Sequence, residues 1–214
     1  NQSPRKERHS RKLYQMFEIT DFIGMIAFAM SGFFVASRSK LDLLGALIST
    51  FLTALGGGII RDIALDRTPY TFTHNYPGLV VLSVFLLMIL FNFHKRESIE
   101  NKPFFIVSDS IGLISFSISG ALIALESDFN LAGVVSMAFV TAVGGGIVRD
   151  VIINEVPFVL KTGFYGTIAL MIGIILYFLD FYNLISIYTI TSLFFLSLVL
   201  RFIAYRRGWS IPLR

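Results

Sequence analysis

Seven long apolar runs, free or nearly free of charged residues, follow one another along this chain. Each is close to the roughly 20 residues that a helix needs to cross the ~30 Å hydrocarbon core of a bilayer. Only helices and closed barrels satisfy their backbone hydrogen bonds there, and the runs lack the alternating polarity of barrel strands. The sequence therefore predicts an all-α integral membrane protein with seven transmembrane helices, at residues 17–37, 42–60, 76–93, 104–125, 131–148, 163–179 and 184–205.

Composition supports this class and excludes several others. The chain is 55% hydrophobic and 15% charged, with a mean hydropathy of +0.73, which is far more apolar than a soluble domain of 214 residues. It has no cysteine, so disulfides and thiolate chemistry are excluded. His9, His74 and His94 are isolated, and no catalytic triad, paired-carboxylate or HExxH pattern appears. We therefore expect no enzyme activity, no metal site and no cofactor.

The net charge of +4 comes largely from residues 1–15. This basic segment lacks the apolar region of a signal peptide and ends just before Met16. Two interpretations stay open: a functional basic tail, or an extension upstream of a natural start at Met16. Because the excess charge is concentrated there, nucleic-acid binding is not supported.

A sequence motif occurs twice, as GGGIIRD at 56–62 and as GGGIVRD at 144–150. A shift of 88 residues aligns the whole region around both copies without a gap. The matches fall on Gly, Asp, Arg, Ser, Thr and Pro rather than on Leu and Ile, which indicates duplication. Aligned pairs include Asp21 with Asp109, Ser31 with Ser119, Gly32 with Gly120, Thr53 with Thr141, Arg61 with Arg149, Asp62 with Asp150 and Pro69 with Pro157.

Each repeat contains three predicted spans, so the second copy enters the membrane from the opposite side. The predicted architecture is two inverted three-helix repeats plus one extra helix, an arrangement common in transport proteins. We divide the chain into a basic extension (1–15), a first repeat (16–103), an inverted second repeat (104–183), and a seventh helix with a basic tail (184–214).

Lysine and arginine are unevenly distributed between the two predicted sides. One side has only Arg61 and Arg67 beyond the N-terminal segment. The positive-inside rule makes the richer side cytoplasmic, which places the N-terminus outside and the C-terminus inside. The residues on the richer side are Arg38, Lys40, Lys95, Arg96, Lys102, Arg149, Lys161, Arg201, Arg206, Arg207 and Arg214.

Three consecutive glycines are expected to interrupt a helix, since each costs about 1 kcal/mol relative to alanine. We predict that the second and fifth membrane helices break at the triplets and present bare carbonyls to a cation. The alternative is that the glycines only allow close helix packing. The repeated triplet followed by a charged pair favours the break. The residues concerned are Gly56, Gly57, Gly58, Gly144, Gly145 and Gly146.

The charged residues beside the triplets have two interpretations. Arg61 and Arg149 either line a pore or extend to the membrane interface. Inverted topology predicts that Asp21 lies near Arg61 at one end and that Asp109 lies near Arg149 at the other. The adjacent Asp62 and Asp150 are alternative partners. Thr53 and Thr141, one turn before the triplets, either bond their own helix or face the path.

The duplicated GGGxxRD motif, the three-plus-three-plus-one spans and the early aspartates resemble the prokaryotic members of the TRIC family, the trimeric intracellular cation channels. The resemblance covers nearly all of residues 16–205. It implies a homotrimer in the inner (plasma) membrane, in contact with lipids, with one pore per protomer that is permeable to monovalent cations, chiefly potassium. Carried over by motif, Gly56–Gly58, Arg61, Gly144–Gly146 and Arg149 line or shape that pore.

Three functions are consistent with these patterns. The first is a passive cation channel. The second is a secondary transporter for a small amino acid such as glycine, which has been proposed for some bacterial relatives. The third is a non-conducting membrane scaffold. Composition does not separate them.

Overall fold

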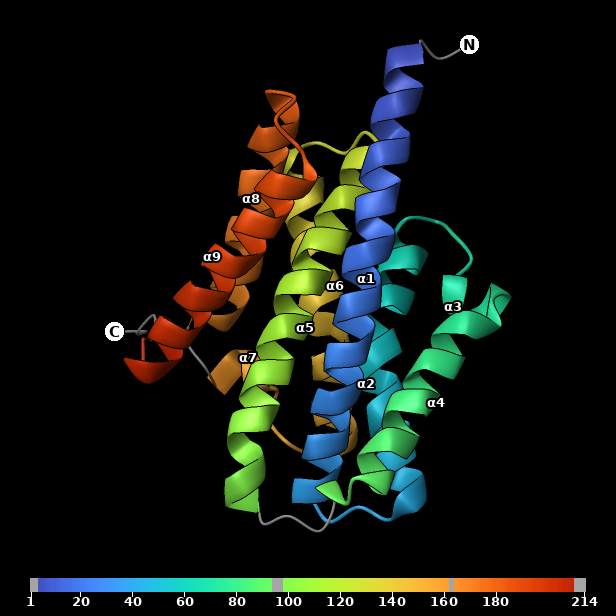
Figure 1. Cartoon of the computed structure of the whole chain (residues 1–214), viewed down its shortest axis with the longest axis vertical. Coiled ribbons are helices and arrows are strands. Elements are labelled where there is room, and N and C mark those ends of the chain that lie inside the picture. The colour runs from blue at the N-terminus through green and yellow to red at the C-terminus, as the bar shows by residue number, and fades with distance from the viewer. Residues whose placement is uncertain (1–3, 94–97, 162–163, 210–214) are drawn as a thin grey trace.

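The structure, a computed structural model, describes residues 4–93, 98–161 and 164–209. His94, Lys95, Arg96 and Arg214, which entered the sequence predictions, lie outside these residues. All regular elements in the described part are helices (Figure 1). They are α1 (Pro4–Arg38), α2 (Leu43–Ala64), α3 (Tyr70–Thr73), α4 (Asn75–Leu90), α5 (Ser98–Glu126), α6 (Leu131–Ile152), α7 (Phe158–Lys161), α8 (Tyr165–Phe181) and α9 (Ile187–Arg206).

Five of these helices, α1, α2, α5, α6 and α9, are long and apolar enough to cross a membrane. The shorter apolar helices α4 and α8, with 16 and 17 residues, coincide with the third and sixth predicted runs. The four-residue helices α3 and α7 were not predicted. Each follows a proline of the aligned pair Pro69 and Pro157, which marks the start of a new element.

The central pair, α1 and α5, runs antiparallel (Figure 1). A Cβ atom on Gly24 would meet the ring of Phe116, and one on Gly112 would meet the ring of Phe28. The two rings themselves pack edge to face at 5.2 Å between centroids. Residue numbers of the contacting pairs increase along α1 while they decrease along α5, so the central helices of the two repeats run in opposite directions.

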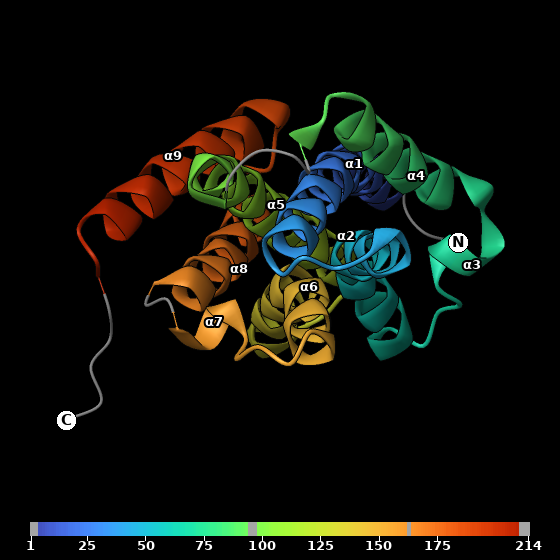
Figure 2. The ribbon, with the colours of Figure 1, turned by 90° about the horizontal axis from the view of Figure 1, so that it is seen from below.

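Seen along the bundle, α1, α2, α5 and α6 form the centre (Figure 2). The pair α3–α4 lies on one side of this centre, and α7, α8 and α9 lie on the other. Helix α9, which has no counterpart in the first half, packs against α5 and α8. The two halves therefore share a plan, but only the second half is covered by an additional helix.

Helix boundaries are set by side chains at equivalent positions in both repeats. Asp42 and Asn130 cap α2 and α6, each accepting from the amide three residues ahead, at 2.7 and 2.9 Å. After the same helices, Asp66 and Asn154 adopt left-handed backbone conformations, with φ of 55° and 59°. Asn and Asp tolerate this conformation better than other non-glycine residues. The duplication therefore extends to the caps and the turns.

Helices α2 and α6 run unbroken through both glycine triplets, so the predicted breaks are wrong. The reason is that the triplets lie where α2 and α6 cross with their backbones in contact. A Cβ atom on Gly57 would overlap the carbonyl oxygen of Thr141, and one on Gly145 would overlap that of Thr53. Close packing, which only small residues permit, outweighs the weak helix propensity of glycine here.

Alanine substitutions within each triplet should destabilise the protein at a glycine that contacts the opposite helix but not at its neighbour. Gly57→Ala and Gly145→Ala force α2 and α6 apart, with an expected loss of about 1–3 kcal/mol in the free energy of unfolding. In Gly58→Ala and Gly146→Ala the added Cβ meets only the guanidinium group of Arg61 or Arg149, with the nearest nitrogen at 3.6 and 3.8 Å, and these changes should be neutral or stabilising. Thermal melting of the purified variants in detergent measures this contrast. Equal effects at all four positions would contradict the crossing.

Candidate functional site

The first charge cluster joins α1 and α2. The Arg61 guanidinium contacts Asp21 through Nη1 at 2.5 Å and Asp62 through Nε at 2.9 Å. The second carboxylate oxygen of Asp62 accepts from the backbone amide of Tyr70, at 3.0 Å, and thus fixes the start of α3. The guanidinium carbon lies 4.7 Å from the centre of the Phe17 ring, a cation–π contact. Only 3% of the Arg61 side chain is exposed.

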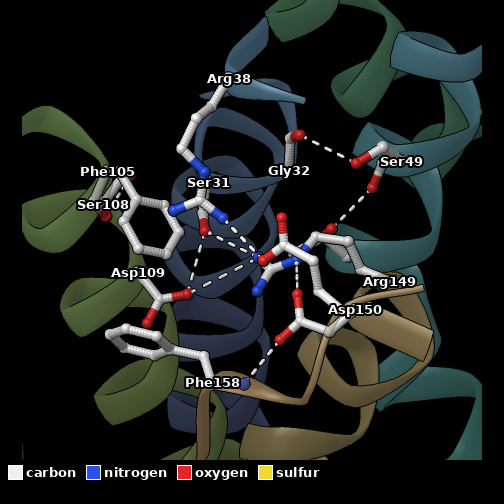
Figure 3. A network of polar contacts seen from close by, with 12 residues as sticks. Ser31, Gly32, Arg38, Ser49, Phe105, Ser108, Asp109, Arg149, Asp150 and Phe158 are labelled. Atoms are coloured by element: carbon white, nitrogen blue, oxygen red, sulfur yellow. Dashed lines mark hydrogen bonds and ion pairs between the residues drawn. The ribbon is translucent and has the colours of Figure 1, made fainter. Parts of the chain in front are cut away.

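The second charge cluster repeats this plan with α5 and α6 (Figure 3). Nε of Arg149 bonds Asp150 at 2.7 Å, and Nη1 lies 3.8 Å from Asp109. Asp150 in turn accepts from the backbone amide of Phe158 at 2.7 Å, at the start of α7. Each arginine thus contacts both of the aspartates that the sequence offered as alternative partners.

Serines from the opposite repeat complete both clusters. Ser31 of α1 donates to Asp109 of α5 at 3.0 Å and accepts from Arg149 at 3.2 Å (Figure 3). Ser119 of α5 donates to Asp21 of α1 at 3.2 Å. The sequence alignment paired these serines without assigning them a role. The signal that could have found them is a polar residue aligned inside two apolar helices, which has to bond something in a bilayer.

The two aligned threonines lie at the crossing of α2 and α6. The Thr53 hydroxyl donates to the carbonyl of Ser49 in its own helix, at 2.6 Å. The Thr141 hydroxyl is buried and has no hydrogen-bond partner among the described residues. The backbone carbonyl groups of Thr53 and Thr141 each face the glycine triplet of the other helix. The structure thus brings the predicted threonines and glycines together at one place, between the two charge clusters.

The clusters differ in their access to solvent. The Asp21 side chain is 20% exposed and borders a cavity of about 620 Å³, whereas the Asp109 side chain is only 2% exposed. In the second half α9 adds a buried cation, Arg201, whose guanidinium lies 4.8 Å from the centre of the Tyr165 ring. We call the cavity beside Asp21 the vestibule. Its lining comes from α1, the end of α2, residues 67–76, and Ile123 of α5.

Within the described ranges, no group of three or more His, Cys, Asp or Glu side chains is arranged so that it could hold a metal ion. His74 stacks on the Tyr70 ring at 3.9 Å, and His9 contacts Asp180 at 2.8 Å. These two histidines therefore take part in side-chain packing and pairing.

These features define an inverted-repeat membrane protein: antiparallel central helices, an equivalent charge cluster in each half, and a backbone contact between α2 and α6. The comparisons with known proteins narrow this class. A family model described as "Glycine transporter" matches residues 18–95 and 106–180, one segment in each half. The chain belongs to the family of the UPF0126 membrane proteins and the prokaryotic TRIC channels.

Two relatives illustrate the match in sequence. The membrane protein YvgT of Bacillus subtilis is 34% identical over 198 residues, which cover 92% of this chain and 96% of YvgT. The inner membrane protein YadS of Escherichia coli K12 is 36% identical over 157 residues, 72% of this chain and 74% of YadS.

Solved structures agree with the sequence relatives. A TRIC cation channel studied for its conductance matches at a TM-score of 0.79 and 34% identity, over 92% of this chain and 97% of that channel. A prokaryotic TRIC channel crystallised in 0.5 M KCl matches at a TM-score of 0.83 and 30% identity, over 92% of this chain and 100% of that channel. The TRIC trimeric intracellular cation channel orthologue from Rhodobacter sphaeroides matches at a TM-score of 0.82 and 28% identity, over 90% of this chain and 98% of that protein.

Removal of one aspartate from each cluster should have unequal effects on stability. Asp109→Asn leaves the buried Arg149 with a single carboxylate, and we expect a loss of about 3 kcal/mol in the free energy of unfolding. Asp21→Asn should cost about 1 kcal/mol or less, because water in the vestibule reaches that cluster. Denaturation of both variants in the same detergent tests this difference. A larger loss in the free energy of unfolding for Asp21→Asn would show that the Asp109 cluster, not the Asp21 cluster, is the one that water reaches.

Proposed function

We propose that this protein is a potassium-permeable channel for monovalent cations, with a pore in each protomer of a homotrimer. The observation that carries the proposal is the match to a TRIC cation channel over 92% of the chain at 34% identity. The trimeric state follows from the same similarity, since the Rhodobacter sphaeroides orthologue is named as a trimeric channel. Buried charges within apolar helices also favour a transport function, because a bilayer tolerates them mainly at functional sites.

The proposed path begins in the vestibule beside Asp21 and Arg61. It continues between α2 and α6 at the glycine triplets and leaves past Asp109 and Arg149. Because the backbones of α2 and α6 are in contact, the described state is closed, and conduction requires these helices to separate. Carbonyl groups at the crossing, with the Thr53 and Thr141 hydroxyls, would then replace part of the hydration shell of a potassium ion.

In the membrane, we propose seven crossings with the N-terminus outside and the C-terminus in the cytoplasm. Helices α4 and α8 are the shortest of the seven, at roughly 24–26 Å for 16 and 17 residues. Lipids surround the bundle, and a thinner bilayer or a tilt of neighbouring helices accommodates the short spans. The relatives YvgT and YadS are membrane proteins, and YadS is placed in the inner membrane.

Secondary transport of a small amino acid such as glycine is the second candidate. The description of the family model favours it. So does the unequal access to the two charge clusters, because inverted-repeat transporters open one half while the other is closed. In that case the crossing of α2 and α6 would separate two alternately open sites.

Reconstitution into liposomes distinguishes these functions. For a channel we expect potassium flux that does not saturate, single-channel steps in planar bilayers, and no glycine flux above that of empty liposomes. Asp21→Asn should reduce potassium flux several-fold, since it removes a carboxylate at the mouth of the path, while the matched change Asp66→Asn in an exposed turn should not. Saturable glycine exchange would establish a transporter instead, and a protein inactive in both assays would be a scaffold.

Orientation can be tested with single cysteines, because the chain has none of its own. Lys40 and Asp128 occupy equivalent exposed turns 88 residues apart. We expect Lys40→Cys to react with a membrane-impermeant maleimide only from the cytoplasmic side, and Asp128→Cys only from the outside. Reaction of both from one side would contradict the inverted arrangement in the membrane.

A further inference from the structure

The vestibule is large enough to be a binding site for a small organic molecule. Its volume of about 620 Å³ falls within the roughly 300–1,000 Å³ of ligand pockets and far exceeds what a single hydrated metal ion needs. The walls come from the middle of α1, residues 14–25, and from the segment between Arg67 and Tyr76. The floor is the Asp21–Arg61 pair.

Negative charge faces this cavity. The two arginines of the lining are already paired: Arg61 with Asp21 and Asp62, and Arg67 with Glu126 at 3.1 Å. The exposed Glu18 also lines the cavity, and no hydrogen bond or ion pair holds its carboxylate within the described ranges. A ligand that enters the vestibule therefore meets the carboxylate of Glu18, unpaired among the described residues, whereas both guanidinium groups already contact carboxylates, and a cation is favoured over an anion or a zwitterion.

Aromatic rings make up much of the remaining lining. Phe22 stacks with Tyr76 at 6.0 Å, and Tyr70 stacks with His74 at 3.9 Å, so these rings support one another in the absence of a ligand. Tyr14 adds a further ring from α1. The face of an aromatic ring attracts an organic ammonium ion while it also packs against the alkyl groups that the ion carries. Rings and carboxylates together select a cation with an apolar surface.

The two repeats show which residues are specific to the vestibule. The aspartates and the arginine of the charge cluster recur 88 residues later, but Glu18 is replaced by Ile106 and Tyr14 by Lys102. The cluster is therefore common to both halves, whereas the free carboxylate and this ring occur only in the first. Ile106 is buried in the second half, where the equivalent cluster is closed. A ligand of the vestibule accordingly has no equivalent site at the other end.

From these observations we propose that the vestibule binds organic ammonium cations, with Glu18 as the counter-charge and the rings of Tyr14, Tyr70 and Tyr76 as the walls. Binding is independent of the proposed channel function, whereas block of potassium flux by such a ligand rests on it. The probe is tetramethylammonium, added to the full-length protein in detergent and followed by calorimetry.

Three variants test the roles of charge and ring. Glu18→Gln should weaken tetramethylammonium binding about tenfold, and Tyr76→Leu about fivefold, while Tyr76→Phe should leave it unchanged because the ring remains. The matched control is Glu155→Gln, an acidic residue that pairs with Arg38 and lies outside the vestibule. No detectable binding, equal affinity in Glu18→Gln, or displacement of the probe by glycine would each overturn the proposal.

Flux measurements separate this site from the channel function. Tetramethylammonium should inhibit potassium flux only from the vestibule side, and Glu18→Gln should relieve that inhibition. A protein that binds the cation but carries no potassium would retain the site and overturn the channel. A protein that conducts potassium but binds no ammonium ion would retain the channel and overturn the site.

Discussion

Backbone contact between α2 and α6 is the interaction on which the rest of the structure depends. Lipid tails are as apolar as leucine, so helices in a bilayer associate through close packing and hydrogen bonds rather than through burial from water. The glycine triplets supply that packing, because a Cβ atom on Gly57 or Gly145 would overlap a carbonyl group of the opposite helix. The two contacts are reciprocal, Gly57 against Thr141 and Gly145 against Thr53, so each half packs against the other in the same way.

The charge clusters fasten the same halves on either side of this crossing. Charged groups are costly in a bilayer and are almost always paired, and the arginine of each cluster contacts two carboxylates. Ser31 and Ser119 bond the aspartate of the opposite repeat, so neither cluster is complete within its own half. Movement of one repeat against the other therefore disturbs both clusters. Helix α9, present only beside the second half, makes that disturbance unequal at the two ends.

Much of this arrangement could be predicted from the sequence, because duplication shows which residues share a structural role. The helical class, the opposite direction of the repeats and the proximity of Asp21 to Arg61 follow from apolar length and from an odd number of spans. The breaks at the triplets were wrong because helix propensity is a local quantity, whereas the contact that stabilises Gly57 comes from a helix about 85 residues away. The vestibule could not be predicted either, since it depends on how the turn after Arg67 folds back against α1.

The glycine backbones at the crossing have a consequence for gating on the proposed path. Two large side chains that interlock must repack when helices separate, and a close-packed interior resists that strongly. Glycine backbones can part without any rotamer change, so fewer side chains have to repack when the helices separate. Separation would uncover the backbone carbonyls of Thr53 and Thr141, which already point across the contact. The glycines that bind the halves together when closed would thus leave carbonyl ligands in the path when open, and a break in either helix is not required.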